Sequence, residues 1–389
     1  MSAKSNQFIE KSKKWLTEDV YPLWSSKGID TKQGGFVESL TFEGEPMDVP
    51  RRAMVQARQI YSFLTGANLE CVSKEVAAAA VRQGTRYMIE KFSSPSGAFI
   101  YSVNPDGTPK SKNPDLYTQA FALFGLAQAY AIEPNKEIKD RAKALFHYLQ
   151  KDRKVAGGGY TEIDEKNGVS YKSNPHMHLF ESAIAWMTVD RNDQDWKDLG
   201  HELVTLATTK FIDKSSGVLG EYFDENWNHL RENGKFIYEP GHQYEWAWLM
   251  FLYEGLTGQN LKSIRHQLFS LAEKHGTSPT RKIAFDEMWS DYTPKTQSSR
   301  FWPQCERIKA AVRLGTEVSK EEQPQYAKAA DEALETLFKF FGTPKKGLWY
   351  DMLSEKDEFN GNTAKASSLY HIVNAMEEYV NLRGKLTDP

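Results

Sequence analysis

The 389-residue chain carries 49 Lys and Arg against 52 Asp and Glu, a net charge of −3, and 40% of its residues are hydrophobic. This near-neutral balance gives no electrostatic reason to expect a nucleic acid or an anionic membrane surface as partner. No stretch approaches the roughly 18 apolar residues of a membrane span, and the N-terminus MSAKSNQFIEKSKKW has no apolar signal core, so we expect a cytoplasmic protein. Cys71 and Cys305 lie in helical patterns and are expected to be free thiols.

Apolar residues recur at helical spacing along the whole chain. In chain order, the predicted helices span residues 7–24, 51–67, 73–92, 115–131, 136–151, 178–190, 195–213, 242–257, 259–274, 300–316, 323–341 and 368–383. Ser73 and Asp115 supply start signals for two of them. Short loops join the two helices of a pair, and long loops join one pair to the next.

A short element that ends in an aromatic residue, usually after glycine, recurs in the long loops. It ends at Phe36, Phe99, Tyr160, Tyr222, Phe285 and Trp349, which are 61 to 64 residues apart. This repeat predicts an all-α barrel of about twelve helices, six inner and six outer, with the long loops and their short hairpins on one face. No Pro- or Gly-rich linker divides the chain, so we expect residues 1–389 to form a single domain.

Each helix that follows a long loop begins with polar residues that a buried helix would not choose. The segments are RRAMVQAR (51–58), DLYTQAF (115–121), NPHMHLFE (174–181), EPGHQYE (239–245), RFWPQCE (300–306) and SSLYH (367–371). If these helices form the inner ring, their ends converge at one cavity, as an active site requires. The same placement selects His176, His178, His242 and His371 over the other five histidines.

Two of these motifs also suit a metal ion. The HxH pair His176 and His178, and the HxxE pair His242 and Glu245, offer ligands that zinc or manganese accept. Basic Arg52 nearby argues against a divalent cation in the same pocket, so we expect no metal and no cofactor. Glu245 lies three residues after His242 on one helix face and is expected to orient it by a hydrogen bond.

Several blocks, taken in order, cover nearly the whole chain: RRAMVQARQIY, DLYTQAFALFGLA, NPHMHLFESAIAW, EPGHQYEWAWL, RFWPQCERIKAAV and KASSLYHI. With them the sequence resembles the N-acylglucosamine 2-epimerase superfamily of sugar epimerases and isomerases. The resemblance implies an (α/α)6 barrel, in agreement with the helix count. The ending ASSLYHI is most similar to the mannose isomerase and aldose–ketose isomerase members.

The resemblance also implies roles for single residues. His242, in PGHxxE, and His371, in the terminal Tyr-His pair, correspond to the family's catalytic histidines. The implied substrate-binding residues are Arg52, Tyr117, Asn174, His176, His178, Glu245, Trp302 and Glu306. An arginine upstream of PGH acts in some isomerases of the family, and here both Arg231 and Lys235 are candidates.

The expected activity is the interconversion of free D-mannose and D-fructose through a cis-enediol, with D-lyxose and D-xylulose as a further pair. His371 would move the proton between C2 and C1, and His242 would open the sugar ring and shuttle protons between O1 and O2. The alternatives are a sugar 2-epimerase, a glycoside hydrolase using Glu245 and Glu306, and a non-catalytic sugar-binding barrel. The expected partner is a monosaccharide, and the protein could be a monomer or a homodimer.

Overall fold

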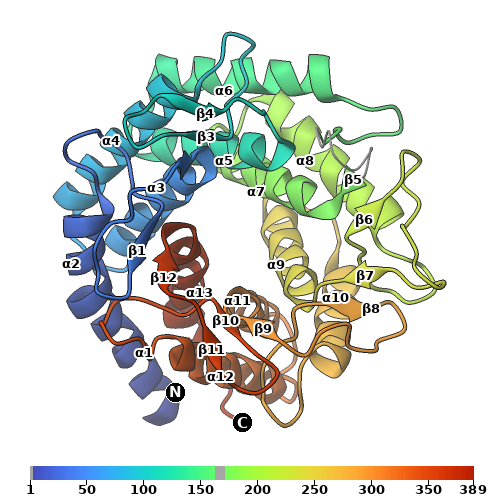
Figure 1. Ribbon diagram of the computed structural model, residues 1–389. Coiled ribbons are helices and arrows are strands. Elements are labelled where there is room, and N and C mark those ends of the chain that lie inside the picture. Colours follow the sequence, from blue (N-terminus) through green and yellow to red (C-terminus); the bar gives the residue numbers. More distant parts are fainter. Residues whose placement is uncertain (1–2, 163–170) are drawn as a thin grey trace.

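Six helices form a closed inner ring in the computed structural model, which describes residues 3–162 and 171–389 (Figure 1). They are α3 (Ala53–Asn68), α5 (Leu116–Ile132), α7 (Ser173–Val189), α9 (Pro240–Thr257), α11 (Trp302–Gly315) and α13 (Leu369–Leu382). Each inner helix contacts the next, and α13 contacts α3, which closes the ring.

An outer layer of helices surrounds this ring. Its members are α1 (Ala3–Trp15), α2 (Tyr21–Leu23), α4 (Lys74–Phe92), α6 (Lys136–Tyr148), α8 (Gln194–Leu206), α10 (Lys262–His275) and α12 (Gln323–Phe340). The π-helical turn Leu16–Val20 joins α1 and α2 into one outer helix, which a second π-helical turn extends to Gly28. The twelve helices predicted from the sequence are therefore confirmed, and they form an (α/α)6 barrel.

The pairing of outer with inner helices follows the chain, except at its ends. From α3 with α4 to α11 with α12, each inner helix packs against the outer helix that follows it. The last inner helix, α13, has no helix of this kind after it and contacts α1 instead. The N-terminal helix therefore completes the sixth pair.

Some helix ends differ from the sequence prediction for local reasons. The helix expected at 178–190 begins five residues earlier, at Ser173, because Pro175 is tolerated in a first turn, where a proline's missing N–H has no partner to lose. Arg51 and Arg52 belong to a strand rather than to α3. Two outer helices are prolonged by the π-helical turns Leu149–Arg153 and Ala207–Phe211.

The amino-acid pattern separates the two layers. The sequence of α5, LYTQAFALFGLAQAYAI, is apolar on nearly all sides, because this helix is enclosed by α3, α7, α4 and α6. In α12 the residues Ala327, Ala330, Leu334 and Leu337 form one buried stripe at helical spacing, and the opposite side is polar. One apolar stripe suffices for an outer helix because only one of its faces packs inward.

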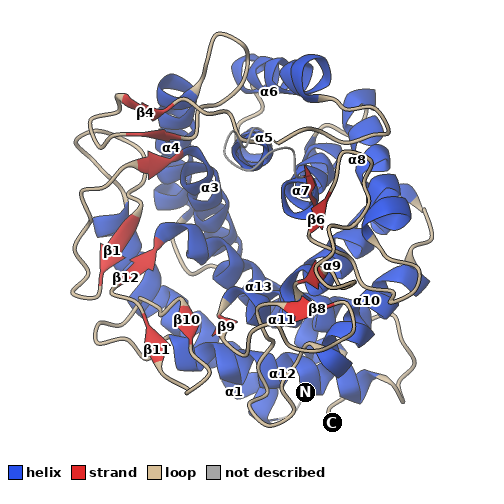
Figure 2. Ribbon diagram, turned by 45° about the vertical axis from the view of Figure 1, so that its right-hand side comes forward, coloured by secondary structure: helices blue, strands red, loops and turns tan. Residues whose placement is uncertain are grey.

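Short antiparallel strands gather at one end of the barrel, drawn red in Figure 2. They are β1 (Ser39–Thr41), β2 (Arg51–Arg52), β3 (Ser102–Val103), β4 (Pro109–Ser111), β5 (Tyr171–Lys172), β6 (Tyr222–Phe223), β7 (Ile237–Tyr238), β8 (Met288–Trp289), β9 (Ser299–Arg300), β10 (Met352–Leu353), β11 (Phe359–Asn360) and β12 (Thr363–Lys365). Strand β1 pairs with β12, so Ser39 lies opposite Lys365 and the first long loop is joined to the last.

A glutamine on the inner helix clasps the long loop in four of the repeats. Each of these side chains accepts the backbone N–H and donates to the carbonyl of one loop residue, at 2.8–3.1 Å. The pairs are Gln56 with Phe36, Gln119 with Phe99, Gln243 with Leu219, and Gln304 with Ala284. We call this arrangement the glutamine clasp.

The clasp corrects the repeat register predicted from the sequence. Phe36, Phe99 and Tyr160 occupy equivalent positions in isolated bridges, but the equivalent residues of the next two repeats are Leu219 and Ala284. The predicted markers Tyr222 and Phe285 were therefore wrong by three residues and by one. The position requires a buried side chain between the two helix layers, and both Leu219 and Ala284 are fully buried without being aromatic.

Within the described part of the chain, no helix has the length and apolar character needed to cross a membrane.

Candidate active site

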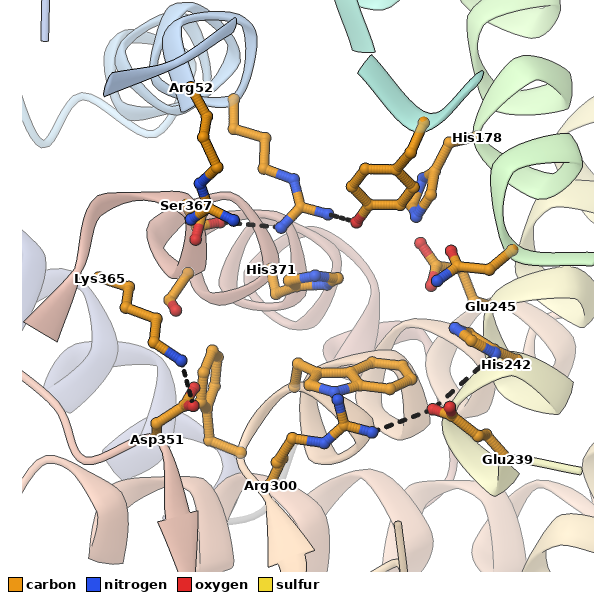
Figure 3. Close-up of a pocket in the computed structure, with 16 residues that line it drawn as sticks. Arg52, His178, Glu239, His242, Glu245, Arg300, Asp351, Lys365, Ser367 and His371 are labelled. Carbon is orange, nitrogen blue, oxygen red and sulfur yellow. Dashed lines mark hydrogen bonds and ion pairs between the residues drawn. The ribbon is translucent and has the colours of Figure 1, made fainter. Parts of the chain in front are cut away.

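A cavity of about 260 Å³ opens among the N-terminal ends of the inner helices (Figure 3). Every inner helix contributes at least one lining side chain: Arg58 (α3), Tyr117 (α5), His178 (α7), His242 (α9), Trp302 (α11) and His371 (α13). The volume suits a sugar rather than a polymer, and most of the lining groups are polar.

The structure brings most of the residues predicted from the sequence to this cavity. Those that line it are Arg52, Tyr117, Asn174, His178, His242, Glu245, Trp302 and His371. Glu306 lies behind His371, and His176 lies elsewhere. Arg231 and Lys235 are also outside the lining, where they pair with Asp213 and Asp291 on the surface.

His242 is oriented by a carboxylate that the sequence did not suggest. Its Nδ1 lies 2.9 Å from Oε2 of Glu221, and Glu239 follows at 3.9 Å. Ser173 donates to the same Glu221 oxygen and helps to fix it. Burial by itself lowers the pKa of His242, but Glu221 and Glu239 raise it more, to about 9. At neutral pH His242 is therefore an imidazolium whose Nδ1–H donates to Glu221.

The expected hydrogen bond from Glu245 to His242 is absent, and that expectation was wrong. Neither carboxylate oxygen of Glu245 has a hydrogen-bond partner among the described residues. His242 is the third residue of α9, so its ring reaches past the helix start toward Glu221 in the preceding loop. Glu245 lies one turn deeper. Burial, together with the nearby Glu306, raises the pKa of Glu245 well above its usual range.

His371 has the opposite electrostatic environment. Its Nδ1 donates to Oε1 of buried Glu306 at 2.7 Å, which leaves the Nε2 lone pair free. Burial, reinforced by the cations Arg58 and Lys309, lowers the pKa of His371 well below its usual value. His371 is therefore neutral when His242 is charged. The two histidines thus have opposite protonation states at neutral pH.

The ring of Trp302 packs near both histidine rings. Its ring centroid is 5.0 Å from that of His242 and 5.7 Å from that of His371. In Figure 3 both histidines border the same open space. A molecule in this space would therefore be within reach of one charged and one neutral imidazole.

Polar groups on the α5–α7 side complete the cavity. The Nδ1 of His178 bonds to Glu181 at 3.0 Å, and burial lowers the pKa of His178 to about 4, so this ring is neutral. Tyr117 accepts from Arg58 at 2.6 Å. The Oδ1 of Asn174 is buried without a hydrogen-bond partner in the described structure, which leaves it available to a ligand hydroxyl.

His176 performs in the third repeat the task of the glutamine clasp. Its Nδ1 donates to Lys172 O at 2.7 Å, and its Nε2 accepts the N–H of Tyr160 at 2.9 Å. Burial lowers its pKa to about 4, as both bonds require a neutral ring. With both nitrogens used by the backbone, His176 has no group to offer a substrate.

Sequence reasoning missed several lining residues: Arg58, Glu239, Arg300, Phe301, Asp351, Lys365, Ser367 and Ser368. Arg58, Glu239 and Arg300 stand in the polar segments that open the inner helices, so the signal for them was present. Asp351 and Lys365 lie in the last long loop and pair with each other at 2.7 Å. Lys365 opens the KASSLYHI block, but no motif included Asp351.

Three groups of side chains have ligand atoms within 4.8 Å of one another, as a metal site requires: His178, Glu181 and Glu245; Glu221, Glu239 and His242; Glu245, Glu306 and His371. Two of these carboxylates already pair with a side-chain cation. Glu239 pairs with Arg300 at 3.1 Å, and Glu306 pairs with Lys309 at 2.6 Å. The negative charge of these two carboxylates is therefore balanced by cations of the protein itself.

The (α/α)6 barrel thus encloses a polar cavity that two histidines of opposite charge state line. The family described as N-acylglucosamine 2-epimerase (GlcNAc 2-epimerase) matches residues 34–375. The chain belongs to this family of sugar isomerases and epimerases.

Similar proteins agree with this assignment. Mannose-6-phosphate isomerase from Rhizobium meliloti (strain 1021) is 34% identical over 368 residues, 94% of each chain. The structure of cellobiose 2-epimerase from Bacillus thermoamylovorans B4167 matches with a TM-score of 0.85 at 18% identity, covering 97% of this chain and 99% of that one. A crystal structure of D-mannose isomerase matches at 0.84 and 20% identity, covering 98% and 99%. The two structures support the fold.

Proposed function

We propose that the protein is an aldose–ketose isomerase that interconverts free D-mannose and D-fructose through a cis-enediol. D-Lyxose and D-xylulose would require the same proton transfer. The observation that carries the proposal is the pair of cavity histidines with opposite protonation, His242 charged and His371 neutral, whose rings both lie within 5.7 Å of the Trp302 ring. The 34% identical relative is a mannose-6-phosphate isomerase, which supports a mannose-type substrate.

The geometry suggests a role for each group. His242 donates its proton to the ring oxygen O5 as the C1–O5 bond breaks, and then takes up the proton of the O1 hydroxyl, which leaves the open-chain aldehyde and a charged His242. The Nε2 of His371 then removes the proton from C2 and returns it to C1, while His242 shuttles protons between O1 and O2. The enediolate charge would be met by Arg58 and Arg52, and Asn174 and His178 would bind sugar hydroxyls. No proton is gained or lost over one cycle.

The charges around the cavity favour a neutral sugar over a phosphorylated one. Arg300 pairs with Glu239 and Asp286, Lys365 pairs with Asp351, and Arg52 pairs with Glu38 at 2.5 Å. At each of these three cations a phosphate dianion would have to displace a carboxylate. Arg58, which donates to Tyr117 and to the Ser367 carbonyl instead, is in the described structure the lining cation without a carboxylate partner. We therefore expect kcat/KM for mannose to exceed that for mannose 6-phosphate by at least about tenfold, measured side by side by NMR; the reverse order would contradict the choice of substrate.

The test of the reaction is incubation of D-mannose in D2O. We expect fructose that carries deuterium at C1 as the first product. Glucose as the sole early product would instead identify a 2-epimerase, the alternative that the family includes. Release of sugar from a glycoside panel would identify a hydrolase. Glu306 lies behind His371 rather than in the cavity wall, so the pair Glu245 and Glu306 does not face a substrate together.

The roles of the two histidines are tested by substitution. His242→Ala and His371→Ala should each lower kcat by about 10²–10⁴-fold, because each removes one acid–base group. The matched control is His147→Ala, which removes an exposed histidine of α6. Full activity in both site variants would exclude the assignment.

A further inference from the structure

Lys309 is a lysine without exposed side-chain surface in the middle of α11. Its ammonium lies 3.8 Å from the centroid of the Trp248 ring and 2.6 Å from Oε2 of Glu306. An ammonium withdrawn from water is costly unless a charged partner replaces the lost hydration. A lysine in this place therefore needs a reason.

The two oxygens of Glu306 serve different partners. Oε1 accepts from Nδ1 of His371 at 2.7 Å, and Oε2 faces the ammonium of Lys309 at 2.6 Å. The three side chains form a row that starts in the protein interior and ends at the cavity, where Figure 3 shows His371. Glu306 and Lys309 are both fully buried, so water cannot replace either of them.

The neighbouring carboxylates do not compete for this contact. Glu181 is occupied by Nδ1 of His178 and by the hydroxyl of Tyr370. Glu245 makes no hydrogen bond among the described residues. Of these three acids, Glu306 is the one in ion-pair contact with Lys309.

We propose that Lys309 is a positioning residue: its ammonium keeps Glu306 a carboxylate, and Glu306 in turn holds His371 in the tautomer whose Nε2 lone pair faces the substrate. This rests on the proposed function only in that His371 acts as the base. Lys309 itself does not touch the cavity, since it is absent from the cavity lining.

The groups that face Glu306, Lys309 or His371 come from every neighbouring inner helix: Arg58 of α3, His178 and Glu181 of α7, His242 and Glu245 of α9, and Tyr370 of α13. Burial raises the pKa of Glu306, and Lys309 opposes that rise. Without the ammonium, Glu306 becomes a carboxylic acid and donates to Nδ1 of His371. The imidazole then carries its proton on Nε2 and is no longer a base toward the cavity.

The experiment compares Lys309→Met, Glu306→Gln and the double variant. Lys309→Met should lower kcat by about 10²-fold with KM within threefold, and should move the acidic limb of the kcat profile to higher pH. The double variant should be no slower than Glu306→Gln, because Lys309 acts through Glu306. Lys328→Met, at an exposed position of α12, is the matched control.

Two results would overturn the proposal. One is an unchanged acidic limb in Lys309→Met with kcat within twofold of wild type. The other is multiplicative loss in the double variant, which would show that the two residues act independently. If Lys309→Met does not fold, as judged by thermal unfolding, Lys309→Gln in the same comparison decides the matter.

A measurement without substrate separates this proposal from the proposed function. Nitrogen-15 NMR of labelled histidines, with His371 assigned by its loss in His371→Asn, should find Nδ1 protonated in wild type and Nε2 protonated in the Lys309 variant. The same tautomer in both proteins would refute the role of Lys309. If the wild type isomerises no sugar but the His371 tautomer still differs between wild type and the Lys309 variant, only the proposed activity is refuted.

Discussion

His242 depends on a glutamate that lies outside its own helix. Glu221 is 21 residues earlier and bonds to Nδ1 of His242 at 2.9 Å. Burial alone would lower the pKa of His242, so the value of about 9 is maintained by Glu221 first and Glu239 second. The protonated form of His242 is therefore stabilised by two carboxylates that lie in loops.

This dependence predicts the pH profile. Because His242 must be protonated to act as acid, kcat/KM should fall as pH rises through about 9. Glu221→Gln removes the largest favourable charge, so the alkaline limb should move to lower pH by about one unit or more. A profile measured between pH 6 and pH 10 tests this, and an unmoved alkaline limb would contradict it.

The same shift affects stability. The folded pKa of His242 is raised above its unfolded value of about 6.5, so its contribution is fully present below pH 6.5 and is lost as pH rises through 9. The free energy of unfolding of the wild type should therefore fall over that window more than that of Glu221→Gln.

At this scale the sequence predicted residue types better than partners. The polar starts of the inner helices identified His242, His371, Asn174 and Trp302, since each stands within the first turns of a helix that faces the cavity. Proximity in sequence suggested Glu245 as the partner of His242, but helix side chains tilt toward the N-terminus. The ring of His242 thus reaches the loop, which no local pattern could indicate.

The glutamine clasp explains how a helix fixes the loop before it. One side chain satisfies both backbone groups of a buried loop residue, which would otherwise be costly to bury. His176 replaces the glutamine in the third repeat and makes the equivalent bond to Tyr160. The clasp positions the polar residues beside it, because the loop and the helix start form one rigid unit.

His176 therefore offers a test at the level of the element. His176→Gln should leave KM and kcat within about twofold of wild type, because glutamine does the same work in four other repeats. His176→Ala leaves the Tyr160 N–H unsatisfied and should cost about 1–3 kcal/mol of unfolding free energy. A large rise in KM for the glutamine variant would restore the sugar-binding role expected from the sequence.

The sequence located the helices by residue range, whereas it predicted the strands only as short hairpins in the long loops, without bounds. The spacing of apolar residues located all twelve helices, because each of them buries a continuous face. The strands span only two or three residues each, too short for an alternating pattern to be visible. The markers at Tyr222 and Phe285 were misplaced for a different reason. The glutamine clasp bonds backbone groups, so its position need not carry an aromatic side chain.

The two ends of the chain meet to close the molecule. Trp24 is fully buried, stacks on Trp349 with ring centroids 5.1 Å apart, and donates to Gly347 O at 3.0 Å. Trp15 stacks on Phe341 at 4.0 Å in the same seam. Strands β1 and β12 extend the contact to the cavity end. The helix count predicted a ring, but these pairs join residues more than 300 positions apart and leave no local sequence signal.

This seam should carry a large share of the stability. Trp24→Ala removes a fully buried indole and its hydrogen bond, so we expect a loss of about 3–5 kcal/mol in denaturant unfolding. Val76→Ala, at a side chain of α4 that is 40% exposed, should change the free energy by less than about 0.5 kcal/mol. A loss below about 1 kcal/mol for Trp24→Ala would mean that the ends contribute little.

All six inner helices point the same end at the cavity. The first turns of five of them supply Tyr117, Asn174, His242, Trp302 and His371, and the second turn of α3 supplies Arg58, so six helix N-termini converge there. Each helix start behaves as roughly half a positive charge. An anion formed in the cavity is thus stabilised by the backbone itself, and no exchange of a single arginine can abolish that share. In the absence of such an anion, the carboxylates that line the cavity, Glu239, Glu245 and Asp351, lie in the same positive field of the helix N-termini.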